Sequence, residues 1–123
     1  LNAACVQHAK PMVEAAMNSM EAYLTTIVPG ETPCLSCLFP EKPEWDRWGF
    51  GVLGAVSGTL ACLAALEAIK LVKGLGKPLL GQLLTMDLAR AEFAKRRPYH
   101  DPDCCVCGSK TTEHPAGLVS TLR

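Results

Sequence analysis

Two Cys-x-x-Cys pairs, Cys34-Leu-Ser-Cys37 and Cys104-Cys-Val-Cys107, are the residues of this chain with the clearest chemistry. A two-residue spacer lets both sulfurs of a pair turn toward one ion, and four thiolates are the usual ligand set of a structural zinc site. The spacing therefore predicts one Zn²⁺ held by Cys34, Cys37, Cys104 and Cys107. Such a site would tie the early part of the chain to its end.

The same cysteines admit other chemistry. A redox-active pair would need a place near a helix N-terminus that lowers a thiol pKa, and both pairs are expected in loops rich in Pro and Gly. Cys105 lies inside the second pair and could compete as a ligand, although its neighbours have the better spacing. His100 could hydrogen-bond near the metal or simply lie at the surface. Cys5 and Cys62 stand in apolar helical contexts, and we expect them to be small core residues.

Length, charge and cysteine usage limit the class of protein. The 123 residues suffice for one small domain, and 12 basic residues balance 12 acidic ones, so nothing favours nucleic acid or an anionic membrane surface as a partner. The seven cysteines are an odd number with metal-like spacing, which predicts a reducing compartment, the cytoplasm. Leu1 is not an initiator methionine, so we expect the chain to be a piece of a longer protein.

Hydrophobic periodicity predicts the elements that position the cysteines. Asn2 is expected to cap a short helix over residues 3–10. Residues 12–16 predict a buried, central strand, and residues 23–28 predict a second strand. Apolar residues at helical spacing predict a long helix over residues 51–73. Residues 81–97 predict two further strands, paired antiparallel.

The stretch 48–66 carries no charged residue, and its length approaches that of a membrane span. Gly54-x-x-x-Gly58 also resembles a helix-dimer motif. Glu67 and Lys70 follow directly, however, and the many small residues permit close packing. We therefore expect this helix to be buried against a sheet and not to cross a membrane.

Seven short motifs occur in an order that resembles the ThiF/MoeB/HesA family, the bacterial relatives of ubiquitin-activating enzymes. The resemblance runs from the start of the chain to about Gly108. It implies an α/β fold: residues 1–109 would form the C-terminal portion of a doubly wound, Rossmann-like adenylating domain with a Cys₄ zinc clip and an antiparallel strand pair, and residues 110–123 a loose tail. The motifs are Leu1-Asn2-x-x-Cys5, Lys10-Pro11-Met-Val, Pro33-Cys-Leu-Ser-Cys-Leu-Phe-Pro40, Gly51-Val-Leu-Gly54, Ala65-Leu-Glu-Ala-Ile-Lys70, Gly81-Gln-Leu-Leu-x-x-Asp87 and Cys104-x-x-Cys107-Gly108.

The resemblance also implies a reaction. Family members use ATP and Mg²⁺ to adenylate the C-terminal glycine of a small ubiquitin-like sulfur-carrier protein, in molybdopterin, thiamine or related biosynthesis. Their nucleotide machinery lies N-terminal to the matched region. We therefore expect the phosphate-binding Gly-x-Gly-x-x-Gly turn and all catalytic and cofactor-binding residues to lie outside this chain, and ATP and Mg²⁺ to bind only with a missing N-terminal half. That half, or a second copy in a homodimer, is an expected partner.

The carrier protein is the other expected partner, and the resemblance implies where it would lie. Residues 38–50 resemble the crossover loop that passes over the carrier's tail, and Trp45 and Trp48 could anchor the carrier or cover the protein's own core. Leu83 and Phe93, on the two late strands, could face the carrier or the core. Arg47 stands where many members carry a cysteine, so we expect no covalent carrier adduct in this loop.

The sequence leaves open two alternatives to the interpretation that this chain is part of an enzyme. The chain could be a non-enzymatic, zinc-stabilised lobe that binds a ubiquitin-like partner and never meets ATP. It could also be a degenerate family member that serves as a scaffold or dimer subunit.

Overall fold

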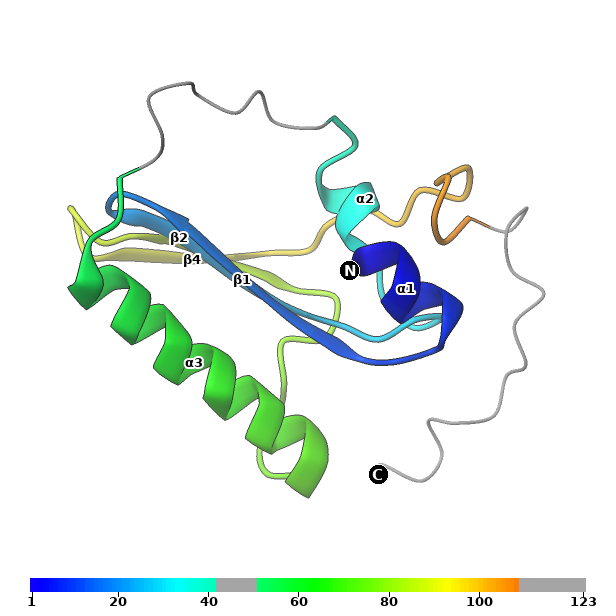
Figure 1. The fold of residues 1–123 in the computed structure, drawn as a ribbon, viewed down its shortest axis with the longest axis horizontal. Helices are drawn as coiled ribbons and strands as arrows, with labels where there is room; N and C mark the ends of the chain where they lie inside the picture. The colour runs from blue at the N-terminus through cyan, green and yellow to red at the C-terminus, as the bar shows by residue number, and fades with distance from the viewer. Residues whose placement is uncertain (42–50, 109–123) are drawn as a thin grey trace.

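The computed structural model describes residues 1–41 and 51–108 and consists of one antiparallel sheet with a long helix on one face (Figure 1). Two short helices lie at one end of the sheet. In chain order the elements are α1 (Asn2–Gln7), β1 (Met12–Asn18), β2 (Glu21–Ile27), α2 (Leu35–Leu38), α3 (Gly54–Lys73), β3 (Leu83–Asp87) and β4 (Glu92–Arg96).

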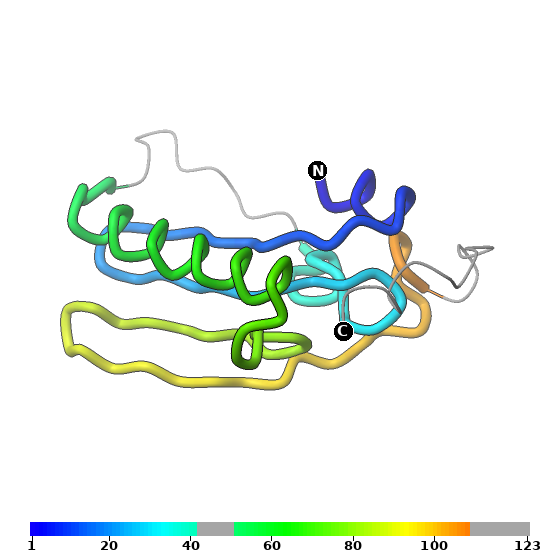
Figure 2. The backbone as a smooth tube through the Cα atoms, turned by 90° about the horizontal axis from the view of Figure 1, so that it is seen from below, coloured from blue at the N-terminus to red at the C-terminus, as the bar shows by residue number. Residues whose placement is uncertain are grey.

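The four strands lie in the order β1-β2-β3-β4, and each pairs antiparallel with its neighbour (Figure 2). The pairing of β3 with β4 confirms the antiparallel pair predicted for residues 81–97. The register sets Glu21 opposite Asp87 and Leu83 opposite Arg96. Because paired residues point their side chains to the same face, this register decides which residues share each side of the sheet.

β1 lies at an edge of the sheet in the described part of the chain, so the second neighbour that a central strand needs is not among the described residues. Apart from Glu14 its residues are uncharged, and only Met12 is fully buried. An apolar run of this kind is typical of a strand with neighbours on both sides. The outer edge of β1 therefore presents unpaired backbone groups without the charged residues that usually protect an edge.

Helix α3 begins at Gly54, three residues later than predicted, because residues 51–53 stay extended and the Gly51 carbonyl accepts a hydrogen bond from the Ser19 N–H at 2.7 Å. It ends as expected at Gly74, whose φ of 65° places it in the left-handed region that glycine favours. Val56 and Leu60 pack on Ala22, Leu24 and Met86 of the sheet. This cluster is the main core.

The outer side of α3 is apolar and exposed, whereas the sequence predicted a helix buried against a sheet. Leu66, Ile69 and Val72 are 51%, 48% and 70% exposed. By length and composition α3 is also apolar enough to cross a membrane, and only 17% of its apolar window is buried. In the structure its inner side lies along β1 and β2.

Glu67 is the one charged residue of the core within the described ranges, with 2% of its surface exposed. Its carboxylate accepts hydrogen bonds from the Thr26 hydroxyl at 3.0 Å and the Leu79 N–H at 2.7 Å, and it pairs with the Lys70 ammonium. The carboxylate thus joins α3 to β2 and to the segment before β3. A buried charge is tolerated because every bond it needs is present.

Candidate metal centre and sheet groove

The two Cys-x-x-Cys pairs lie side by side at the end of the sheet beside α1 and α2 (Figure 1). Their four sulfur atoms all lie within 4.8 Å of one another. Cys34 and Cys104 are 3.7 Å apart and buried, and Cys37 and Cys107 are 3.4 Å apart and partly exposed. The structure thus brings together the four cysteines that the spacing predicts, and they could hold a metal ion.

The distances fit a tetrahedral metal site. Four sulfurs around one ion with bonds of about 2.3 Å lie about 3.8 Å from one another, and the closest pairs here are separated by 3.4, 3.7 and 4.0 Å. A disulfide needs sulfur atoms only about 2.05 Å apart. The geometry therefore matches a common ligand set and not two disulfides.

The surroundings of the thiols give them different acidities. Burial raises the pKa of Cys37 and of Cys107. Burial acts in the same direction on Cys104, but the N–H groups of Cys107 and Val106 outweigh it and lower the pKa of that thiol to about 7. Neutral thiols packed this closely contribute little to stability. A divalent cation would bind them as thiolates and offset the free-energy cost of burying these charged groups.

Cys34 is the N-cap residue of α2, so the first pair does not lie in a loop as expected. A helix of only four residues has a small dipole, which weakens the argument that this position makes Cys34 redox-active. The turn instead directs the Cys34 and Cys37 sulfurs to the same side. The position of Cys34 at the start of α2 is therefore consistent with a pair of metal ligands on one turn.

Asn2 is the residue near the metal centre whose role differs most from the prediction. It lies within α1 and makes no side-chain cap there. Its Oδ1 instead accepts the Leu35 N–H at 3.1 Å, and its Nδ2 donates to Ser36 Oγ at 3.1 Å and toward Cys34 Sγ at 3.6 Å. Asn2 therefore caps α2 and holds α1 against the first cysteine pair.

Gly108 closes the second pair, and the space around it explains why a glycine stands there. Its N–H donates to the Cys104 carbonyl at 2.8 Å. A Cβ at this position would lie 2.5 Å from the same oxygen and 2.7 Å from the Pro102 oxygen, both backbone atoms. Any side chain would push the two halves of this turn apart.

Gly108→Ala is expected to open the turn and weaken metal binding by about tenfold or more, comparable to the loss of other supporting contacts around metal sites. Gly58→Ala is the matched control, because nothing lies within 4 Å of a Cβ on this exposed residue of α3. The control is expected to raise stability by about 0.5–1 kcal/mol. Competition with a metal indicator measures the first effect and thermal melting the second. Equal metal affinity for Gly108→Ala and the original chain would contradict the assigned role of Gly108.

The structure places the remaining three cysteines and His100 around or away from the cluster, and for Cys62 the position differs from the prediction. Cys105 is exposed and lies outside the four-sulfur cluster. His100 is also exposed, yet its Nε2 lies 3.7 Å from Cys107 Sγ. Cys62 lies exposed on α3, so the expectation that it is a core residue is wrong, and Cys5 is half-buried. Apolar neighbours in sequence indicated burial for Cys62, but its side of α3 faces away from the sheet.

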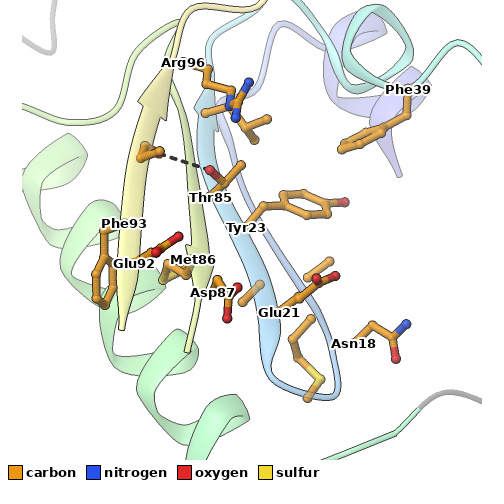
Figure 3. Close-up of a pocket in the computed structure, with 15 residues that line it drawn as sticks. Asn18, Glu21, Tyr23, Phe39, Thr85, Met86, Asp87, Glu92, Phe93 and Arg96 are labelled. Atoms are coloured by element: carbon orange, nitrogen blue, oxygen red, sulfur yellow. Dashed lines mark hydrogen bonds between the residues drawn. The ribbon is translucent and has the colours of Figure 1, made fainter. Parts of the chain in front are cut away.

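An open groove of about 910 Å³ lies across the sheet, and Figure 3 shows its lining. Tyr23 and Phe39 form one wall, with ring centroids 5.0 Å apart. Burial and the nearby Glu14 carboxylate raise the pKa of the Tyr23 hydroxyl, so it stays a neutral hydrogen-bonding group. Leu83, Thr85 and Arg96 contribute from β3 and β4. This groove combines an apolar middle with polar ends, which suits a protein or peptide partner.

Leu83 and Phe93, the two strand residues proposed to bind a partner, both line the groove. The register nevertheless sends their side chains to opposite faces of the sheet. Leu83 pairs with Arg96, whereas Phe93 pairs with Met86, a core residue under α3. Phe93 is 57% exposed because it lies beyond the edge of that helix. A single partner surface over the open face would therefore contact Leu83 more directly than Phe93.

Three predicted positions lie outside the described residues: Trp45, Trp48 and Arg47. The chain does contain the spacing Gly-x-Gly-x-x-Gly, at Gly49-Phe-Gly-Val-Leu-Gly54, contrary to the expectation that it lies outside this chain. A phosphate-binding turn of this type follows a buried strand, and the preceding residues 41–48 contain a proline and five charges. The string therefore lacks the sequence context of a nucleotide site.

Comparison with known proteins identifies the family. Residues 1–106 match the ThiF family. Over 109 residues the chain is 75% identical to "Protein HesA, heterocyst" of Trichormus variabilis, covering 89% of this chain and 41% of that protein. It is 37% identical over 122 residues to the "Sulfur carrier protein adenylyltransferase" of Thermus thermophilus, covering 92% of this chain and 45% of that protein. The chain belongs to the ThiF family and spans about two fifths of the length of these relatives.

The fold agrees with that assignment. The structure superimposes on Escherichia coli MccB, crystallised with MccA-N7isoASN, with a TM-score of 0.75 at 22% identity, covering 87% of this chain and 36% of that one. This likeness confirms that the sheet and its helices form part of a Rossmann-like α/β fold. The strands described here are the antiparallel part of that fold.

Proposed function

We propose that this chain is the C-terminal part of an ATP-dependent enzyme that adenylates the C-terminal glycine of a ubiquitin-like sulfur-carrier protein. The chain supplies a structural zinc site and the surface that receives the carrier. The carrier carboxylate attacks the α-phosphate of ATP and pyrophosphate leaves, and residues outside this chain perform that step. The setting is the cytoplasm, and the pathway is molybdopterin, thiamine or related sulfur chemistry.

The match of residues 1–106 to the ThiF family carries the reaction in this proposal, and the four-cysteine cluster carries its zinc site. Its sulfur distances fit a tetrahedral ion, and zinc is the metal that closed four-sulfur sites usually hold. With four cysteine ligands, a bound zinc ion would have no open position and would serve a structural role. Cys34, Cys37, Cys104 and Cys107 hold the two ends of this segment together, and Asn2 and Gly108 support them.

The sheet groove supports the carrier-binding part of the proposal. It lies on the open face of the strands, away from α3, and Leu83 and the Tyr23–Phe39 pair give it an apolar middle. An exposed apolar patch rimmed by polar residues often marks a site of protein–protein contact. Phe39 follows α2 directly and lines the groove, so the segment proposed as the crossover loop begins at the groove wall.

ATP–pyrophosphate exchange tests the proposal directly. The protein is purified from its natural source with any polypeptide that accompanies it, and intact mass identifies the species present. Exchange is then measured with and without ubiquitin-like carriers that end in glycine. Exchange that appears only with such a carrier supports the proposed reaction. If the protein carries zinc and binds a carrier but no exchange occurs in any combination, the non-enzymatic binding lobe is the better description. Exchange without any carrier would also contradict the proposal.

A further inference from the structure

The floor of the sheet groove is ordered in rows that run across the strands. The first row is Asn18, Glu21, Asp87 and Glu92, one residue from each strand in register order. All four also line the groove. The row therefore sets three carboxylates side by side at one end, in the lower half of the close-up in Figure 3.

The next rows change in character along the strands. The second row contains Tyr23 and Thr85 with two alanines and has no charge. The third row is Glu14, Thr25, Leu83 and Arg96, and of these only Leu83 and Arg96 line the groove. Arg96 lies at the far end of the groove in Figure 3. Four residues separate the first row from the third along β2, which corresponds to about 13 Å. The lining residues are thus acidic at one end, apolar in the middle and basic at the other end, and Glu14 lies on β1 outside that lining.

Like charges directly opposite one another in neighbouring strands destabilise a sheet. Within the described ranges, Asp87 has one weak counter-ion, Arg90 at 3.8 Å, and Glu21 and Glu92 have none. Arg96 likewise makes no ion pair among the described residues. Its side chain is exposed and therefore accessible to an acidic group of a partner. The charges do not neutralise one another within the sheet, so they are available to a partner.

We propose that this charge gradient fixes the orientation of the carrier in the groove. A basic side chain of the carrier lies against Glu21, Asp87 and Glu92, an apolar side chain lies on Tyr23 and Phe39, and an acidic side chain lies against Arg96. The partner is thus a ubiquitin-like protein whose contact patch is apolar at its centre, basic at one end and acidic at the other. This inference rests on the proposed carrier and deepens it.

Charge pairs at a rim act mainly on the rate of association and on its dependence on salt. Direct binding therefore tests the inference without any assay of activity. The probes are the ubiquitin-like sulfur carriers with a terminal glycine that are encoded in the same genome, immobilised one at a time. The variant Glu21→Gln/Glu92→Gln removes two charges but leaves Asp87, whose Oδ1 accepts the Ala89 and Arg90 N–H groups of the following turn.

The double variant is expected to slow association with the carrier by about tenfold at low salt and to flatten its salt dependence. Arg96→Gln is expected to act in the same direction. Glu31→Gln and Lys77→Gln are the matched controls, because both residues are exposed and neither lines the groove. A carrier variant that exchanges its own basic residue for glutamate should bind Glu21→Lys/Glu92→Lys better than it binds the original protein.

The outcomes separate this inference from the proposed reaction. If a carrier binds and the groove variants associate as fast as the controls, the charge gradient does not orient the carrier, even where ATP–pyrophosphate exchange is intact. If no carrier binds the original protein, the inference is overturned as well. Binding with the expected charge dependence but without exchange supports the groove and contradicts only the reaction. Circular dichroism of each variant shows that the sheet is folded.

Discussion

Cys104→Ser is expected to abolish stoichiometric zinc binding and to unfold the end of the molecule that holds α1, α2 and the second cysteine pair. Cys104 is buried and its sulfur lies 3.7 Å from that of Cys34, so no neighbouring side chain can replace it without rearrangement. Structural zinc contributes about 10–16 kcal/mol in small domains, as much as the whole stability of a typical protein. Chelation of zinc from the original protein should have the same effect.

Cys105→Ser is the matched control for this prediction. It removes a sulfur from the adjacent residue, which is exposed and lies outside the cluster. Zinc content per chain and thermal melting measure both variants. One zinc per chain in Cys104→Ser, with unchanged melting, would remove Cys104 from the site. Loss of zinc in Cys105→Ser would show instead that the ligand set has been assigned to the wrong cysteine.

The second large effect is expected at Glu67, and Glu67→Ala should cost about 2–5 kcal/mol of stability. The truncation removes the acceptor of the buried Thr26 hydroxyl and of the Leu79 N–H and leaves a cavity beneath α3. Lys70→Met is the control. It keeps both of those bonds but removes the counter-ion of a carboxylate that is 3% exposed, so it should also cost stability, though less than Glu67→Ala. Chemical denaturation measures both, and equal losses would mean that the ion pair, not the buried bonds, is what matters.

The pH dependence of this effect has a definite sign. Burial alone raises the pKa of the Glu67 carboxyl, but donors from Lys70, Leu79 and Thr26 outweigh it and hold the pKa below the ordinary 4.5. A carboxyl with a lowered folded-state pKa contributes stability above its unfolded pKa and loses it as the pH falls through the folded value. The stability difference between the original protein and Glu67→Gln should therefore shrink as the pH is lowered from about 6 to below about 4.5.

Elements defined by local chemistry could be predicted from the sequence. The spacing of Cys34, Cys37, Cys104 and Cys107 identified the cluster, because a two-residue spacer constrains both sulfurs wherever the pair lies. The C-terminal end of α3 at Gly74 followed from the same kind of local rule, since glycine is favoured in the left-handed conformation. The succession of helices and strands along the chain also followed from hydrophobic periodicity.

Features that depend on distant partners could not be predicted in this way. Asn2 was expected to accept an N–H at a helix start, and it does, but the helix is α2 and not its own. The side-chain preference was correct, whereas the partner 33 residues away depended on how the chain packs. Cys62 and the edge position of β1 show the same limit: apolar sequence indicates burial against something without saying that the partner lies in the described part of the chain.

The groove shows the limit most directly. Alternation along β3 and β4 separates their residues into two faces, but only the register across strands sets Glu21, Asp87 and Glu92 in one row. A shift of one residue would have sent one of these carboxylates to the other face. The same register sends Leu83 and Phe93 to opposite sides, which the strand pattern alone left open.

The distance in sequence between the two cysteine pairs also orders the events of biosynthesis. Cys34 and Cys104, which contact each other, are separated by 70 residues. At about 5–20 residues per second, a ribosome needs about 4–14 s to make the intervening chain. The first pair leaves the ribosome without the second. All four cysteines are present only after the four strands described here have been synthesised. A metal ion could therefore bind all four sulfurs only late in synthesis, and a nascent chain truncated before Cys104 would lack the second pair.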